Sequence, residues 1–168
     1  MPAVPKKRIM LVEDDADTAT ALSMLFRLEG FDAQVAKNGR QGYQSSLENP
    51  PDLVVTDLSM PVMTGFDLII AFKENAALRD IPIIAVSAMD TSKLQSAVKL
   101  GAQAVYQKPL DFERFLDAII RMLAPSGGKQ SPGGRNSART PGHSSVPRSG
   151  GGYTEFSPAE TVSHLQRG

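Results

Sequence analysis

The sequence lacks residues on which many catalytic and binding sites depend. It has no cysteine among its 168 residues, and its two histidines, His143 and His164, both lie near the end of the chain. The absence of cysteine excludes disulfides, thiolate zinc sites and thiol nucleophiles, and it suits a reducing cytoplasm. Because no histidine precedes residue 143, a Ser-His-Asp triad or a histidine-ligated metal within residues 1–124 is also excluded.

The chain also lacks a long apolar run and a large excess of charge. No stretch approaches the roughly 20 apolar residues that a membrane-spanning helix needs, and no apolar signal segment follows residues 1–8. Residues 1–124 carry 13 basic and 16 acidic side chains, so they offer no electrostatic reason to bind nucleic acid or an anionic membrane. We therefore expect a soluble cytoplasmic protein that binds neither nucleic acid nor membrane.

Composition divides the chain near residue 124. Residues 125–168 contain 9 Gly, 5 Pro and 8 Ser, and only 7 of these 44 residues are apolar. Such a segment cannot build a hydrophobic core, so we expect one domain over residues 7–124 and a disordered tail over residues 125–168. The run Ser157-Pro158-Ala159-Glu160 matches a helix capping box. A short segment that folds on a partner is therefore an alternative to a fully solvated tail.

Within the domain, short apolar segments alternate with amphipathic ones. Strands are expected at residues 9–12, 31–36, 53–56, 81–86 and 104–106, and a helix is expected after each of them. The last helix follows Asp111 and has an apolar stripe of Phe112, Phe115, Leu116, Ile119 and Leu123. Continuous apolar strands that alternate with helices predict an α/β fold, a doubly wound parallel sheet covered on both faces.

Polar side chains follow four of the five expected strands. They are Glu13, Asp14 and Asp15 after the first strand, Asp57 after the third, Ser87 after the fourth and Lys108 after the fifth. Because parallel strands place their carboxyl ends at one edge of a sheet, these side chains are expected to converge there. One lysine cannot neutralise three or four carboxylates, so the cluster predicts a divalent cation. Oxygen ligands without histidine or cysteine favour Mg²⁺, with Mn²⁺ as a substitute.

The same edge is suited to a phosphoryl group. Mg²⁺, the Lys108 ammonium and the Ser87 hydroxyl together can hold three phosphoryl oxygens. Asp57 is then the candidate nucleophile, since a carboxylate that attacks phosphorus forms an acyl phosphate. Asp15 is the exception in the acidic cluster, and we expect it to cap the following helix.

At these residues the chain resembles the receiver domain of two-component response regulators. The resemblance covers about residues 7–124 and rests on Glu13-Asp14, Asp57, Met60-Pro61, Gly65, Ser87-Ala88 and Lys108-Pro109. It implies a CheY-like, flavodoxin-like fold of five strands in the order 2-1-3-4-5 with five helices.

The resemblance also implies a signalling role for the domain. Asp57 would accept a phosphoryl group from a phosphohistidine of a sensor histidine kinase or phosphotransfer protein, and Ser87 and Lys108 would bind its oxygens. Asp14, Asp57 and the Ser59 carbonyl would ligate Mg²⁺, with Glu13 acting through water. Such a domain is a switch that removes its own phosphoryl group rather than an enzyme with a separate substrate. We expect it to act without an output domain of its own.

Two residues bear on how the signal is passed on. The family usually has an aromatic residue three positions before the lysine of the fifth strand, and here that position is Val105. Tyr106 cannot replace it, because adjacent strand residues point to opposite faces. A downstream protein would bind the face formed by the helix at residues 91–100, the fifth strand and the last helix. The alternative suggested by Val105 is a binding module that works independently of phosphorylation. The second residue is Met89, at a position that in this family flanks the phosphoryl site. Its apolar side chain is expected to restrict the attack of water.

Overall fold

The computed structural model describes residues 5–124, and strands and helices alternate throughout this part of the chain. The strands are β1 (Arg8–Val12), β2 (Asp32–Ala36), β3 (Leu53–Asp57), β4 (Ile83–Ser87) and β5 (Ala104–Gln107). The helices are α1 (Ala16–Leu28), α2 (Gly39–Glu48), α3 (Gly65–Glu74), α4 (Thr91–Leu100) and α5 (Phe112–Leu123). None of the helices in this part of the chain is long and apolar enough to cross a membrane.

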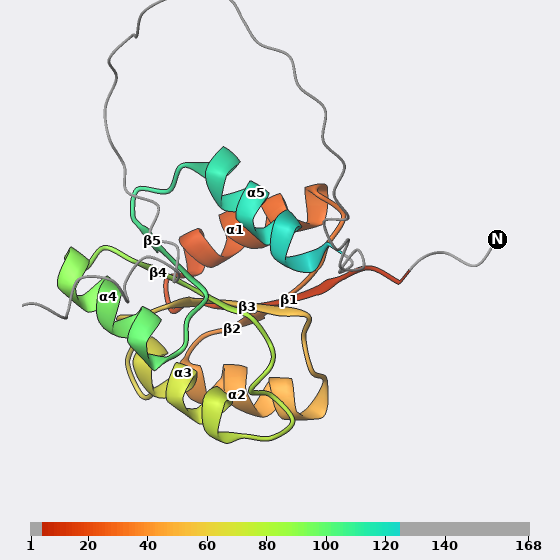
Figure 1. Ribbon diagram of the computed structural model, residues 1–168. Helices are drawn as coiled ribbons and strands as arrows, with labels where there is room; N and C mark the ends of the chain where they lie inside the picture. Colours follow the sequence, from red (N-terminus) through yellow and green to blue (C-terminus); the bar gives the residue numbers. More distant parts are fainter. Residues whose placement is uncertain (1–4, 125–168) are drawn as a thin grey trace, which may run out of the picture. The chain divides into compact units, whose positions relative to one another are not determined.

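The strands form one parallel sheet in the order β2-β1-β3-β4-β5. This is the predicted CheY-like order, with β3 at the centre of the sheet. Helices α1 and α5 lie on one side of the sheet and α2, α3 and α4 on the other (Figure 1). Every residue of β3 and β4 is buried, as a strand covered on both faces must be.

Each face of the sheet has its own hydrophobic core. On the α1 and α5 side, buried residues of β1, β3 and β4 pack against Phe26 and Phe115, whose ring centroids are 6.1 Å apart. On the other side, alternate residues of the same strands pack against Leu68, Phe72 and Leu94. The two cores fix the helices to the sheet, so the loops at its carboxyl edge are attached to a rigid frame.

Side-chain caps define where the helices begin at that edge. The N-cap residues are Asp15, Asn38, Thr64, Asp90 and Asp111, and each accepts a hydrogen bond from a backbone N–H in the first turn of its helix. The expectation that Asp15 is a cap is thus confirmed, and its hydrogen bond with Thr18 lowers the pKa of its carboxyl. Since every helix follows a strand, these capped ends lie at the carboxyl edge of the sheet and bring the positive ends of the helix dipoles to it.

The structure differs from the sequence-based expectations at several boundaries. The fourth strand is Ile83–Ser87 rather than residues 81–86, and Asp57 is the last residue of its strand rather than the first residue of a loop. Phe112 was expected to be buried but is 51% exposed, because it is the first residue of α5. The predicted tail over residues 125–168, including the capping box at Ser157, lies outside the described residues.

Candidate functional site

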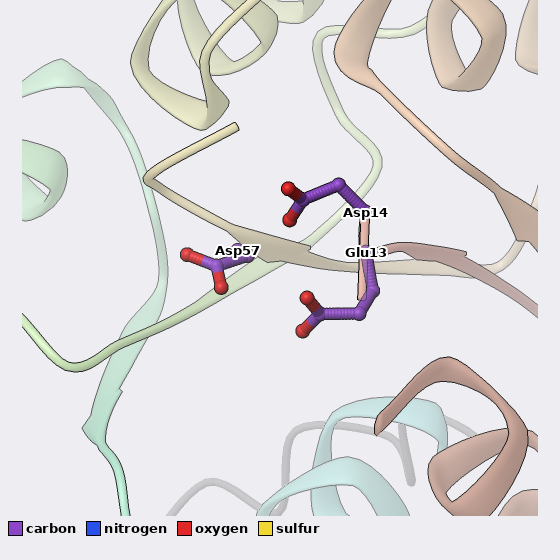
Figure 2. Close-up of side chains that lie close together, drawn as sticks. All are labelled: Glu13, Asp14 and Asp57. Carbon is purple, nitrogen blue, oxygen red and sulfur yellow. The ribbon is translucent and has the colours of Figure 1, made fainter. Parts of the chain in front are cut away.

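Three carboxylates lie close together at the carboxyl edge of the sheet. Glu13 and Asp14 directly follow β1, and Asp57 ends the neighbouring strand β3. Each side chain offers one carboxylate oxygen, and these three oxygens lie within 4.8 Å of one another. The three side chains surround a common space (Figure 2). Glu13 and Asp57 are only 3% and 9% exposed, whereas Asp14 is exposed. The cluster thus has two shielded acids and one at its rim.

The Lys108 ammonium joins two of these carboxylates. Its Nζ donates hydrogen bonds to Asp57 Oδ2 at 2.8 Å and to Glu13 Oε2 at 3.1 Å. Burial acts to lower the pKa of Lys108, but the hydrogen bonds to Asp57 and Glu13 outweigh it, so the pKa is raised. Burial raises the pKa of Glu13, and hydrogen bonds from Lys108 and from the Asp15 amide offset only part of this effect. Lys108 is therefore held in its charged form, while burial disfavours the ionised form of Glu13.

The loop after β3 binds the second carboxylate oxygen of Asp57. The Ser59 N–H donates to Asp57 Oδ1 at 2.9 Å, so the loop binds one carboxylate oxygen and Lys108 binds the other. The Gly65 N–H donates to the Leu58 carbonyl at 3.2 Å. A Cβ on Gly65 would overlap the Asp57 carbonyl oxygen and lie 2.8 Å from Leu58 Cα. Only glycine therefore allows α3 to begin this close to the end of β3.

Ser87 is fully buried at the end of β4. Its Oγ accepts a hydrogen bond from the Met89 N–H at 3.2 Å, and its carbonyl accepts one from the Lys108 N–H at 2.9 Å. The backbones of Ser87 and Lys108 are thus joined by a hydrogen bond, while the Ser87 hydroxyl faces the loop between β4 and α4.

Gln107 is a residue of this region that the sequence analysis did not single out. It lies opposite Ser87 in the register of β4 and β5, and its Nε2 donates to the Met89 carbonyl at 3.2 Å. Its position directly before Lys108, at the end of a strand, is the sequence signal that could have identified it.

Val105 and Tyr106 point to opposite faces of β5, as expected. Val105 packs against the core under α3 and α4. Tyr106 packs on the α5 side, where its ring lies edge-on to Phe115 with centroids 5.3 Å apart and an interplanar angle of 77°. Tyr106 therefore does not occupy the place that an aromatic residue at position 105 would fill.

The donor set of the cluster fits a hard divalent cation. Three carboxylates and one ammonium carry formal charges of −3 and +1, which leaves an excess of two negative charges around one space. The three acids offer only oxygen ligands, and Mg²⁺ prefers carboxylate and carbonyl oxygens together with water. The exposure of Asp14 leaves room for such waters on the solvent side.

Comparison with known families and sequences gives a consistent assignment for this part of the chain. A model described as the response regulator receiver domain matches residues 9–120. The transcriptional regulatory protein PrrA of Mycobacterium tuberculosis is 30% identical over 125 residues, which cover 74% of this chain and 53% of PrrA. The polar-differentiation response regulator DivK of Brucella anthropi is 28% identical over 118 residues, which cover 70% of this chain and 96% of DivK. The chain thus matches about half the length of PrrA but nearly all of DivK.

Solved structures show the same fold. The chemotaxis protein CheY4 of Vibrio cholerae is 24% identical with a TM-score of 0.66, covering 71% of this chain and all of that structure. The receiver domain of HemR from Leptospira biflexa, in its non-phosphorylated form, is 27% identical with a TM-score of 0.65, covering 74% of this chain and all of that structure. Both similarities support the strand order and helix arrangement described above.

Proposed function

Because the chain belongs to the response regulator receiver domain family, we propose that it is a phosphorylation switch in two-component signal transduction, with Asp57 as the phosphoryl acceptor. Receivers are signalling domains that interact with histidine kinases or phosphotransfer proteins. The observation that carries the proposal is the position of Asp57. It is a shielded carboxylate held by the Ser59 N–H on one oxygen and by Lys108 on the other, beside two further acids.

The residues around Asp57 support in-line transfer from a phosphohistidine. An Asp57 carboxylate oxygen forms a bond to phosphorus while the bond between phosphorus and the histidine nitrogen breaks, and the electron pair of that bond stays on nitrogen. Lys108 shifts from the Asp57 oxygen to a phosphoryl oxygen, and the Ser87 hydroxyl donates a hydrogen bond to another. Ser87 ends β4 and Lys108 directly follows β5, so the sheet fixes the backbone of both groups and only their side chains have to reorient.

The acidic cluster supports binding of Mg²⁺ through Asp14, Asp57 and the Ser59 carbonyl, with Glu13 acting through a water molecule. When bound, the cation supplies positive charge that lowers the repulsion between the carboxylates and an incoming phosphoryl group. The same site would let water remove the phosphoryl group from Asp57, which gives the signal a limited lifetime.

The partners of the whole protein follow from the chemistry of a receiver. The phosphoryl donor is a histidine kinase or phosphotransfer protein, and the downstream partner is a protein that binds the face of α4, β5 and α5. The chain has no cysteine, which suits a reducing cytoplasm, and residues 1–124 carry 13 basic and 16 acidic side chains, so we propose that this domain acts in the cytoplasm through protein partners rather than through DNA.

Incubation with acetyl phosphate and Mg²⁺, followed by peptide mass spectrometry, tests the proposal. The expected result is an acid-stable, base-labile phosphoryl group on Asp57 that is absent from the Asp57→Asn variant. The Asp52→Asn variant, which changes an aspartate at the opposite edge of the sheet, serves as the control and should be modified normally. Modification of a different residue, or none in the presence of Mg²⁺, would refute the assignment.

Val105 favours a second candidate, a receiver-like module that binds its partner independently of phosphorylation. The usual aromatic position is filled by an aliphatic side chain, and Tyr106 is held on the opposite face by Phe115. A pull-down with the phosphorylated protein and with the Asp57→Ala variant separates the two functions. Equal recovery of the same partner by both forms would favour the second.

A further inference from the structure

The backbone of Met89 is held from both sides in the loop between β4 and α4. Its N–H donates to Ser87 Oγ at 3.2 Å, and its carbonyl accepts from Gln107 Nε2 at 3.2 Å. Ser87 is at the end of β4, and Gln107 lies opposite it at the end of β5. One loop residue therefore connects the buried hydroxyl of the site to the edge strand of the sheet.

These two hydrogen bonds stabilise the arrangement of the loop without a phosphoryl group. To bind a phosphoryl oxygen, the Ser87 side chain must turn toward Asp57 on the neighbouring strand. That turn takes the Ser87 Oγ away from the Met89 N–H. The Met89 N–H then loses its protein acceptor, and the hydrogen bond from Gln107 to the Met89 carbonyl opposes a movement of the loop toward a new one.

We propose that Gln107 is a positioning residue that acts through Met89 to hold Ser87 in its unphosphorylated orientation. The inference rests on the proposed function for its consequence, since the restraint matters only if a phosphoryl group binds at Asp57. The geometry also gives a polar route from Ser87 to β5 in a chain whose position 105 is valine. The Gln107 side chain is exposed, so this restraint is accessible to a downstream partner that binds β5.

The energetic consequence is a shift in population between two loop arrangements. If the hydrogen bond from Gln107 to Met89 forms only in the unphosphorylated arrangement, it disfavours the phosphorylated arrangement by its net free energy. For an exposed neutral pair this corresponds to roughly a two- to fivefold change in an equilibrium constant. Removal of the Gln107 donor should therefore make the phosphorylated arrangement easier to reach, whereas a residue that only stabilises the fold would have no such effect.

The matched variants are Gln107→Met and Gln103→Met. Methionine has nearly the length of glutamine but no N–H donor. Gln103 also uses its side chain to contact the backbone of β4, since its Oε1 accepts from the Ile83 N–H at 2.7 Å, but it does so at the amino end of that strand. A general effect on the pairing of β4 with β5 should appear in both variants, and an effect on Ser87 only in Gln107→Met.

The first measurement needs no phosphoryl group. Amide hydrogen exchange of the full chain, followed by NMR, should show exchange of the Met89 N–H that is roughly two- to fivefold faster in Gln107→Met than in the wild type or in Gln103→Met. An unchanged Met89 rate would overturn the proposed restraint directly, whatever the function of the protein.

The second measurement uses beryllofluoride with Mg²⁺ as a mimic of the phosphoryl group. The Gln107→Met variant should bind it roughly two- to fivefold more tightly than the wild type, and Gln103→Met should bind it as the wild type does. Unchanged or weaker binding by Gln107→Met would overturn the role in Ser87 orientation. If the wild type binds no beryllofluoride, the proposed function fails and the switching role of Gln107 fails with it. A change in Met89 exchange would then establish only a restraint on the loop.

Discussion

Lys108 Nζ lies 2.8 Å from Asp57 Oδ2, so the single lysine of the acidic cluster is already bound to the proposed phosphoryl acceptor. It also lies 3.1 Å from Glu13 Oε2. The ammonium therefore reduces the repulsion between two shielded carboxylates in the protein without metal, and it is in place to follow the negative charge when that charge moves onto a phosphoryl group.

Replacement of Lys108 by methionine should destabilise the metal-free protein by about 1–3 kcal/mol, because two largely buried carboxylates lose their shared cation. Addition of Mg²⁺ should recover part of this loss, since the metal supplies charge to the same oxygens. Urea unfolding with and without Mg²⁺ measures both effects. Lys93→Met, at an exposed lysine of α4, is the control. An equal loss of stability with and without Mg²⁺ would contradict the idea that Lys108 and Mg²⁺ supply positive charge to the same carboxylates.

The Gly65→Ala variant should unfold more easily by about 1–3 kcal/mol, because the added methyl group overlaps the Asp57 carbonyl. Phosphorylation by acetyl phosphate should also slow, since the clash displaces the backbone of the acceptor. The control is Gly101→Ala, where φ is 117° and the added methyl group would lie 2.8 Å from the Lys73 Cε atom. Gly101 follows the last residue of α4, at the opposite edge of the sheet, so Gly101→Ala should lose stability but keep its phosphorylation rate. Similar slowing in both variants would argue against a local effect.

Met89→Asn should shorten the lifetime of the phosphoryl group on Asp57 severalfold. The Met89 side chain is partly buried against the core on the α3 and α4 side, and its thioether is a poor partner for water. An amide at this position can hydrogen-bond a water molecule and help it to reach phosphorus. Decay of phosphorylated protein, followed by intact mass after removal of the donor, gives the rate. Unchanged decay would show that Met89 does not restrict water.

Asp52 should make stability depend on acid pH at the opposite edge of the sheet. Burial acts to raise the pKa of Asp52, but its hydrogen bonds with the Arg8 N–H at 2.7 Å and with Lys7 at 2.9 Å outweigh it, so the pKa is lowered. The stabilisation is therefore present above the ordinary pKa of aspartate and is lost as the pH falls through the lower folded-state pKa. Because the pair with Lys7 is partly exposed, the effect should stay below about 1 kcal/mol.

Unfolding of wild type and Asp52→Asn between neutral and strongly acid pH measures this contribution. The free energies of unfolding of the two proteins should differ at neutral pH and become equal in acid. Asp32→Asn, at an exposed aspartate that pairs with Arg8 at 3.7 Å, should show a smaller difference. If the free energies of unfolding of wild type and Asp52→Asn differ by the same amount at all pH values, the loss of stability in the variant does not come from the ionisation of Asp52.

Val62 should be a site where glycine stabilises the protein. Its φ is 73°, in the left-handed region that a β-branched residue rarely adopts, and its side chain is 73% exposed. Val62→Gly should raise the free energy of unfolding by about 1 kcal/mol, because strain is released and little packing is lost. Thermal unfolding tests this, with Val35→Gly in β2 as the control that should be destabilised. A loss of stability in Val62→Gly would show that its contacts outweigh the strain.

The sequence predicts the sheet and the membership of the site because both depend on local pattern. Apolar segments of strand length end in polar residues, and a parallel sheet brings those ends together whatever the details of packing. The sequence therefore predicts that Glu13, Asp57 and Lys108 lie in one cluster, and in the structure Lys108 is within hydrogen-bond distance of both acids.

The sequence could not predict the individual contacts within the site. That Ser87 Oγ is bound by the Met89 N–H, and that Gln107 binds the carbonyl of the same residue, depends on loop geometry and strand register. Phe112 differs from the sequence expectation for a related reason. Helical spacing places it on the apolar stripe of α5, but the stripe begins where the helix first contacts the sheet, and that is at Phe115.

The five side-chain caps have a consequence for how such a domain can diversify. Each loop at the carboxyl edge is anchored by a strand at one end and by a capped helix at the other. Exposed loop residues such as Val62 can therefore be exchanged to suit a new partner while the acids and the lysine keep their relative positions. Partner recognition and phosphoryl chemistry can therefore change independently, although the residues for both lie at the carboxyl edge of the sheet.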